Sequence, residues 1–335
     1  MTDVQWIQTA LAHAECEAVP YNFMFSPPAE REARDRYGNN IEESLALPLR
    51  MTGPASIKPL YADPARYGGT IRDEFGVVWS TSAIDRGSPI GPCLPEPNLS
   101  STRFPEPDAA YRFDGMAEWC ARQEGQFRII WVGDLWERAT FMRGMEPLLL
   151  DIALNPLFVE SLLRQLSDYV LETARILLER FSFEGIAVSD DYGTQKAMLM
   201  SPADWRRFVR PCLAPIYELA KRHGRAVFHH SCGNITPIIG DLTDMGLDIL
   251  HPIQPEAMDI LRLKREFGRD LTFCGGIPTQ HLLVAGTPDD IRREVRRLKR
   301  QMGDGGGYIL EPGITIQADV PIANIAAMID EARRP

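Results

Sequence analysis

The chain has 335 residues, a length that fits two average domains or one closed α/β barrel. It carries 36 Lys and Arg residues against 46 Asp and Glu, a formal net charge of −10 without a basic block, which argues against binding nucleic acid or an anionic membrane. No apolar run approaches the ~18 residues that span a bilayer, and the first residues lack the basic and apolar regions of a secretory signal. We therefore expect a cytoplasmic protein whose six scattered cysteines stay reduced.

The N-terminal part of the chain gives few regular patterns. Residues 20–25 are apolar and aromatic and predict a strand, and residues 71–79 predict a β-hairpin. Residues 84–110 contain six prolines among Gly, Ser and Asn, which excludes a helix or a central strand. Because strong patterning resumes directly afterwards, we interpret 84–110 as a long ordered loop over one mouth of a single domain that spans residues 1–335. Residues 128–132 then predict another strand.

The C-terminal part alternates short apolar strands with longer amphipathic helices. Three of the helices start with a capping residue followed by proline, at Asn155-Pro156, Ser201-Pro202 and Thr287-Pro288. The predicted helices cover 155–181, 201–224, 235–246, 256–267, 287–302 and a closing segment from 321. The predicted strands cover 185–189, 226–230, 248–251, 270–274 and 308–310.

This alternation is typical of βαβ units in a parallel sheet. Together with 20–25 and 128–132, the strands approach the eight of a (β/α)8 TIM barrel, with the hairpin and the proline-rich loop as insertions. The alternative is a doubly wound open sheet. It is disfavoured because no glycine-rich phosphate turn follows an early strand.

In such a barrel, reactive groups stand at the carboxyl ends of the strands. His230 and Cys232 lie two residues apart at one strand end, so their side chains point the same way, and imidazole with thiolate suits Zn²⁺. Cys274 ends the second strand along, roughly 9–10 Å away, a gap that metal bonds and side chains can close. Gln254 or Glu256 could complete the metal's ligands. Alternatively, Cys274 simply fills the barrel core.

Acidic and aromatic residues follow the same strand ends. Asp190 and Asp191 are adjacent, so at most one of them enters the site, unless both belong to a plain solvated turn. Asp134 and Glu311 are further acids where strands end. Besides Asp134 and Gln254, the substrate-binding candidates are aromatic residues that line a pocket or, alternatively, belong to the core: Phe23, Trp131, Trp136 and Tyr192.

Several of these segments together resemble a known family. The segments 131–139 (WVGDLWERA), 190–195 (DDYGTQ), 230–233 (HSCG), 274–280 (CGGIPTQ) and 306–310 (GGYIL) occur in an order similar to that of the uroporphyrinogen decarboxylase superfamily. The resemblance implies a (β/α)8 barrel. It also implies one of two activities: decarboxylation of tetrapyrroles, or zinc-dependent methyl transfer between corrinoid proteins and thiols.

Two sequence features separate these branches. The decarboxylases resemble one another in an arginine-rich N-terminal stretch that holds the substrate carboxylates, whereas residues 27–34 here are mixed in charge and lack an R-x-x-G-R pattern. The His-x-Cys pair of the methyltransferases is present as His230 and Cys232. Corrinoid–thiol methyltransferases usually carry a further cysteine in a P-G-C context, but here Ile314 follows Pro312-Gly313. Either Cys274 or Glu311 replaces that ligand, or the metal has been lost.

The sequence therefore predicts a zinc methyltransferase that moves a methyl group between a small substrate or thiol and a corrinoid on a separate partner protein. His230, Cys232 and Cys274 would bind the metal, and Asp190, Asp191 and Glu311 are the catalytic candidates. Two alternatives follow in rank: a metal-free decarboxylase that uses the same three acids, and a non-catalytic ligand-binding barrel.

Overall fold

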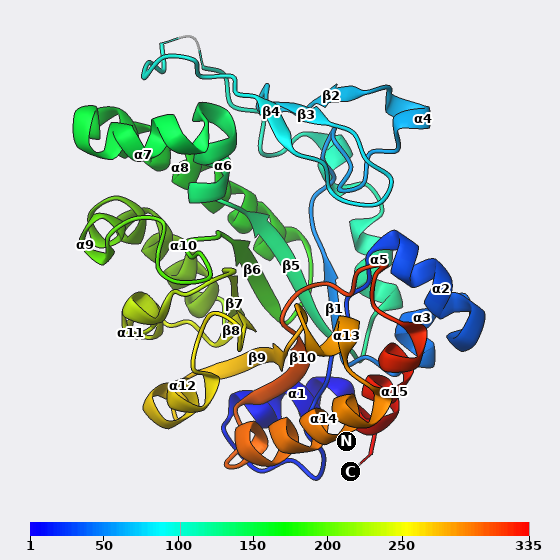
Figure 1. The fold of residues 1–335 in the computed structure, drawn as a ribbon. Coiled ribbons are helices and arrows are strands. Elements are labelled where there is room, and N and C mark those ends of the chain that lie inside the picture. The colour runs from blue at the N-terminus through cyan, green and yellow to red at the C-terminus, as the bar shows by residue number, and fades with distance from the viewer. Residues whose placement is uncertain (101, 335) are drawn as a thin grey trace.

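A curled, seven-stranded parallel sheet forms the centre of the computed structural model, which describes residues 1–100 and 102–334 (Figure 1). Neighbouring strands follow one another in the order β1-β5-β6-β7-β8-β9-β10, and every neighbouring pair is parallel. Their bounds are β1 (Leu49–Thr52), β5 (Phe127–Gly133), β6 (Gly185–Ser189), β7 (Ala226–His230), β8 (Ile249–Ile253), β9 (Thr272–Ile277) and β10 (Tyr308–Pro312).

The eighth position of the predicted barrel is held by residues 20–25, but only through two isolated bridges. Tyr21 bridges Leu310 and Phe25 bridges Ile316, both in parallel orientation. Four backbone hydrogen bonds hold the segment: Asn22 N and Ser26 N donate to the carbonyls of Leu310 and Ile316, and Leu310 N and Ile316 N donate to those of Pro20 and Met24. The α/β class and the parallel curled sheet are therefore confirmed, whereas a regular eight-stranded barrel is not.

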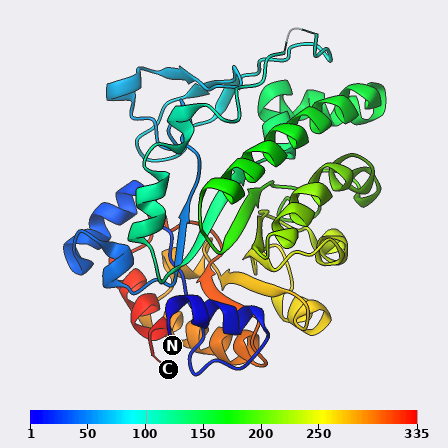
Figure 2. The same ribbon diagram turned by 180° about the vertical axis from the view of Figure 1, so that it is seen from behind.

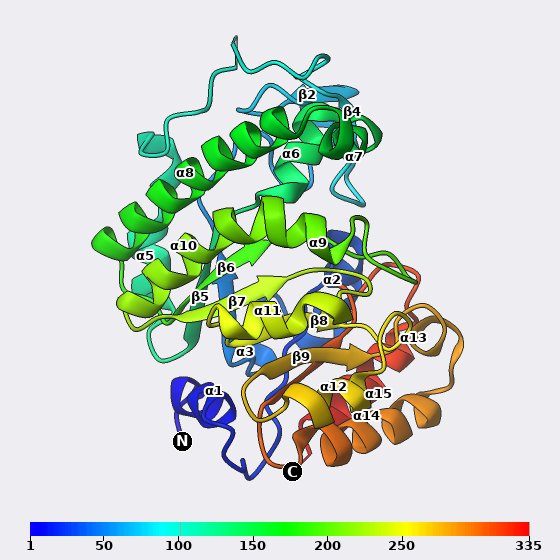
Figure 3. The ribbon, with the colours of Figure 1, turned by 90° about the vertical axis from the view of Figure 1, so that its left-hand side faces the viewer.

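Helices cover the outer face of the sheet (Figures 2 and 3). The helices α8, between β5 and β6, and α10, between β6 and β7, lie at the positions predicted from the alternation of strands and helices in the sequence. The helical segments are α1 (Asp3–Leu11), α2 (Pro27–Tyr37), α3 (Ile41–Ser44), α4 (Pro64–Tyr67), η1 (Ala110–Phe113), α5 (Met116–Arg122), α6 (Trp136–Arg143), α7 (Met145–Leu154), α8 (Pro156–Arg180), α9 (Pro202–Asp204), η2 (Trp205–Val209), α10 (Arg210–Arg222), η3 (Thr236–Ile238), α11 (Ile239–Asp244), α12 (Ile260–Phe267), α13 (Leu282–Ala285), α14 (Pro288–Gly303) and α15 (Ile322–Ala332). Across residues 1–100 and 102–334, every helix is too short or too polar to cross a membrane.

The inside of the curled sheet is a small core of its own. Phe127, Ala187, Phe228 and Cys274 meet there, and Ile7 of α1 packs against the same cluster. A capping box formed by Thr2 and Gln5 fixes the start of α1. The helix therefore closes one end of the sheet interior and leaves the other end for the loops that follow the strands.

Most predicted elements lie where the sequence places them, with shifts at their ends. β6 and β7 match the predicted 185–189 and 226–230, whereas β8 and β9 run on to Ile253 and Ile277. The helix predicted from 256 begins at Ile260, because the Gln254 carbonyl accepts from the N–H groups of Ala257 and Met258 in a turn. β1 was not predicted: it is four residues long and lacks alternation.

A second, three-stranded antiparallel sheet of β2 (Thr70–Arg72), β3 (Val78–Ser80) and β4 (Pro89–Gly91) lies beside α6 and α7 in Figure 1. The predicted hairpin at 71–79 is confirmed by the β2–β3 pairing. Its turn is held by the Asp73 carboxylate, which accepts from Phe75 N, Val77 N and Trp79 Nε1. The proline-rich segment from residue 84 supplies the edge strand β4, a position that tolerates proline.

Candidate active site

Three metal-ligand side chains meet where β6 and β7 end. Asp191 follows β6, and His230 and Cys232 stand at the end of β7. His230 Nε2 lies 3.5 Å from Asp191 Oδ1 and 3.5 Å from Cys232 Sγ, while Cys232 N donates to Asp191 Oδ1 at 2.7 Å. The ligand atoms lie within 4.8 Å of one another. We call this group the mouth cluster, and its nitrogen, sulfur and oxygen donors form a set that Zn²⁺ accepts.

A second group, the buried cluster, consists of His251, Cys274 and Glu311. Cys274 Sγ donates to Glu311 Oε2 at 3.0 Å, and His251 Nε2 lies 3.7 Å from the same oxygen. All three are buried, and their ligand atoms also lie within 4.8 Å of one another. Burial raises the pKa of Glu311 to about 7 and raises the pKa of the Cys274 thiol well above its usual range.

The two clusters touch through their histidines. β7 and β8 pair His230 with His251 in register, and the two Nδ1 atoms lie 2.9 Å apart. Burial lowers the pKa of both imidazoles, which favours the neutral form of each ring. A hydrogen bond between the rings fixes their orientation, as outer partners do for metal-binding histidines.

The three predicted zinc ligands therefore do not form one group. His230 and Cys232 lie together, but Cys274 belongs to the buried cluster and to the core inside the sheet. The reason is that the residues lie at different distances from the carboxyl ends of their strands. His230 is the last residue of β7, whereas β9 continues for three residues beyond Cys274. Gln254 does approach the mouth cluster, with Nε2 at 3.7 Å from Cys232 Sγ. Glu256 instead accepts from Thr279 N and Gln280 N.

The adjacent aspartates have different environments. Asp190 is fully buried and accepts from Leu135 N and Glu137 N, both at 2.9 Å, and from the Tyr192 hydroxyl at 3.0 Å. These bonds tie the end of β6 to the start of α6, and the catalytic role predicted for Asp190 stays a prediction. Asp191 points to the mouth cluster.

A cavity of about 560 Å³ opens beside the histidines. Its lining residues come from the strand ends and from the loops above them: Met24, Leu60, Tyr61, Asp85, Arg86, Trp131, Ser189, His230, His251, Ile314, Thr315 and Gln317. Of the predicted substrate-binding residues, Trp131 lines this cavity.

The other predicted substrate-binding residues lie elsewhere. Trp136 and Tyr192 are fully buried in the main core: Trp136 is the first residue of α6, and the Tyr192 ring packs against Trp205 of η2. Phe23 lines a neighbouring cavity of about 460 Å³ between residues 22–25 and β1. Asp134 pairs with Arg138, at 3.2 Å between Oδ1 and Nε.

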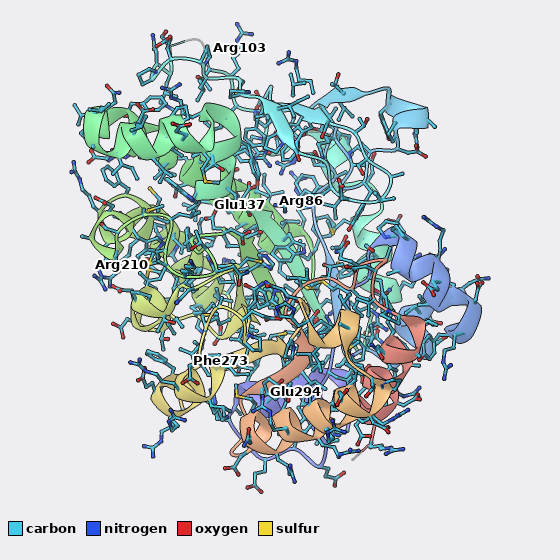
Figure 4. All side chains as sticks on the ribbon, viewed as in Figure 1. Arg86, Arg103, Glu137, Arg210, Phe273 and Glu294 are labelled. Carbon is cyan, nitrogen blue, oxygen red and sulfur yellow. The ribbon has the colours of Figure 1, made fainter. Side chains whose placement is uncertain are left out.

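Sequence reasoning missed an ion pair next to the cavity. Arg86 from the proline-rich segment lies 3.2 Å from Glu137 of α6, and both are labelled close together in Figure 4. Ser189 Oγ donates to the other Glu137 oxygen at 3.1 Å. Burial, with the nearby Asp191 charge, raises the pKa of Glu137 to about 7. Glu137 directly follows a strand-end motif and could have been suspected, whereas no sequence pattern places Arg86 at the site.

Comparisons with known proteins agree with this architecture. The family model described as uroporphyrinogen decarboxylase (URO-D) matches residues 132–335. Two curated proteins called uroporphyrinogen decarboxylase, from two strains of Thermus thermophilus, are each 27% identical to this chain over 139 residues. That match covers 39% of this chain and 37% of each relative's length.

A solved structure extends the likeness to the whole fold. The chain resembles a methyltransferase from Methanosarcina mazei with a TM-score of 0.74 at 17% identity, over 99% of this chain and 98% of that one. At this level of identity, the likeness shows that the two proteins share a fold.

Proposed function

We propose that this chain, which belongs to the uroporphyrinogen decarboxylase family, is a metal-dependent methyltransferase that works at the mouth cluster. It would move a methyl group between a small substrate or thiol and a corrinoid carried by a separate protein. The observation that carries the proposal is the convergence of Asp191, His230 and Cys232 beside a cavity of about 560 Å³.

The mouth cluster fits a zinc ion chemically. It offers one carboxylate, one imidazole and one thiol, and the His230 ring is already oriented through Nδ1, which leaves Nε2 for a ligand bond. Asp191 thus takes the place that the sequence assigned to Cys274. A Zn²⁺ ion bound there would act as a Lewis acid that favours the anionic form of a substrate thiol or hydroxyl.

The residues around the cavity position the substrate. Trp131 provides an apolar wall, and Arg86 brings one positive charge to the opening. Glu137 is a positioning residue, because it holds Arg86 on one oxygen and Ser189 on the other, and both partners line the cavity. Since its pKa is about 7, its charge changes near neutral pH, and the hold on Arg86 changes with it.

The charge of the cavity favours methyl transfer over decarboxylation of a polycarboxylate. Among the lining residues, Arg86 carries the positive charge, and the neighbouring Asp85 and the paired Glu137 offset it. A substrate with many carboxylates needs several arginines or lysines. Two observations favour the decarboxylase alternative. Glu137 has a pKa of about 7, which suits proton transfer, and the Thermus relatives are called uroporphyrinogen decarboxylase.

The test compares four proteins purified without chelator: the unmodified chain, Cys232→Ser, Asp191→Asn and the control Cys212→Ser, whose half-buried thiol lies outside both clusters. Free methylcobalamin serves as methyl donor for a panel of thiols, with loss of its absorbance as the readout. We expect transfer in the unmodified chain and in the control, and at least a tenfold lower rate in the two cluster variants. Release of CO₂ from a carboxylated ring at a rate unchanged by chelator would instead establish the decarboxylase.

A further inference from the structure

The buried cluster contains a polar atom that nothing in the described residues satisfies. His251 Nε2 has no hydrogen-bond partner, although the side chain is only 1% exposed. The atom lies 3.7 Å from Glu311 Oε2, and the Cys274 thiol donates a hydrogen bond to the same oxygen. Burying a polar atom without a hydrogen-bond partner destabilises the folded state. The position of this atom next to a thiol and a carboxyl group therefore indicates that a bound ligand supplies the partner.

A divalent ion is the partner that suits all three groups. Zn²⁺ accepts imidazole nitrogen, thiolate sulfur and carboxylate oxygen. Its charge of two balances the thiolate and the carboxylate, so the filled cluster is neutral and can stay buried. When the ion binds, the thiol proton of Cys274 leaves to solvent, and so does the proton of Glu311 in the molecules in which that carboxyl group is protonated. Asn22 Nδ2 donates to Glu311 Oε1 at 3.2 Å, which leaves Oε2 for the ion.

The ion has a path to this cluster, because His251 lines the same cavity as His230. The hydrogen bond between the two rings, however, limits how the two clusters can be filled. A neutral imidazole carries one proton, on Nδ1 or on Nε2. Across the contact of 2.9 Å, one Nδ1 donates and the other accepts.

The ring that donates through Nδ1 has a free lone pair on Nε2, whereas the ring that accepts has its proton on Nε2. A metal bonds to the lone pair, so the neutral pair offers one metal-binding Nε2 at a time. With His230 as donor the mouth cluster is ready for an ion, and with His251 as donor the buried cluster is ready.

We propose that His251, Cys274 and Glu311 form a second site for Zn²⁺ or a similar divalent ion, and that it fills only when the mouth cluster is empty. The site itself stands on the buried cluster alone, whereas the exclusion rests on the proposed function at the mouth. The three ligands of the buried cluster are at most 2% exposed, so an ion held among them would be shielded from a substrate in the cavity and would not support transfer.

The experiment titrates the metal-free full chain with Zn²⁺ and, separately, with Co²⁺. The variants are Cys232→Ser, Cys274→Ser and the double variant, with Cys120→Ser as a control that removes a buried thiol outside both clusters. Bound metal is counted after gel filtration, and the thiolate-to-cobalt absorption band reports sulfur ligation. Circular dichroism establishes that each variant is folded. Glu311→Gln, which keeps the side-chain volume, replaces Cys274→Ser in single and double form if the latter does not fold.

We expect one tightly bound ion per chain in the unmodified protein, in each single variant and in the control, and none in the double variant. The sulfur band should persist in Cys232→Ser, where Cys274 is the cluster thiolate that remains. Two ions in the unmodified chain would overturn the exclusion.

The two proposals fail in different ways. A folded Cys232→Ser that binds no metal would overturn the buried site and leave the mouth cluster as the metal site. A folded Cys274→Ser without metal, beside a Cys232→Ser that keeps it, would overturn the mouth cluster and leave the buried site.

Discussion

Replacing Asp190 with alanine should destabilise the protein strongly, because three buried donors lose their acceptor. These are Leu135 N, Glu137 N and the Tyr192 hydroxyl, at 2.9, 2.9 and 3.0 Å. A buried donor left unpaired costs ~1–3 kcal/mol, so the three together cost about 3–9 kcal/mol. For 335 residues at ~2.1 cal/mol/K per residue, the unfolding entropy is about 0.7 kcal/mol/K, so Tm should fall by about 4–13 °C.

The neighbouring Asp191→Ala is the matched control for this measurement. Asp191 accepts one backbone hydrogen bond, from Cys232 N, and its side chain is 30% exposed. Its loss should cost about 1 kcal/mol, which corresponds to a Tm shift of roughly 1–2 °C. Thermal melts of metal-free protein followed by circular dichroism measure both. If Asp190→Ala melted within roughly 2 °C of Asp191→Ala, Asp190 would not be the structural link described here.

Three further predictions concern the site and its support. The folded-state pKa of Glu137 is raised to about 7 from 4.5, so its contribution to stability is present below pH 4.5 and lost as pH rises through 7. Glu137→Gln should therefore flatten the decline of Tm between pH 5 and 8, and an unchanged decline would contradict the assignment. Arg86 lowers the pKa of Glu137, so Arg86→Gln should move that decline to higher pH in the same melts, and a shift to lower pH would rule out the ion pair. Gly233 has φ +81°, and a Cβ there would lie 2.4 Å from the Gly193 carbonyl carbon, so Gly233→Ala should cost about 2–5 kcal/mol. Gly224→Ala, at φ +65° in open space, should cost only about 1–2 kcal/mol, and equal losses in urea unfolding would refute the steric argument.

The C-terminal part of the fold could be predicted because its signals are local. Capping side chains with proline fix the starts of α9 and α14, proline alone marks the start of α8, where the Asn155 side chain makes no capping bond, and short apolar runs mark β6 and β7. β1 could not be found this way, because Leu49–Thr52 is short and gains its place from pairing with β5. The apolar pattern at 20–25 predicts a strand, but the sequence does not reveal that this segment forms only isolated bridges.

The site was predictable where it depends on strand alternation. His230 and Cys232 do face the same side, as residues two apart at a strand end should, and Asp190 and Asp191 do meet different partners. Cys274 was misplaced because the sequence predicts that a strand exists more reliably than where it ends. Three further residues of β9 move its thiol from the mouth into the sheet interior.

The distance of each residue from the carboxyl end of its strand therefore decides which side chains it contacts. The register between β7 and β8 sets His230 against His251, and that between β9 and β10 sets Cys274 close to Glu311. A shift of one residue in either pairing would turn a ligand to the opposite face of the sheet and dissolve the corresponding cluster. The same pairing that brings the two imidazoles together places one N–H proton between their Nδ1 atoms. Under the exclusion proposed above, the two adjacent sets of ligands would act as alternatives for a single ion, although each set taken alone has the donors to bind one.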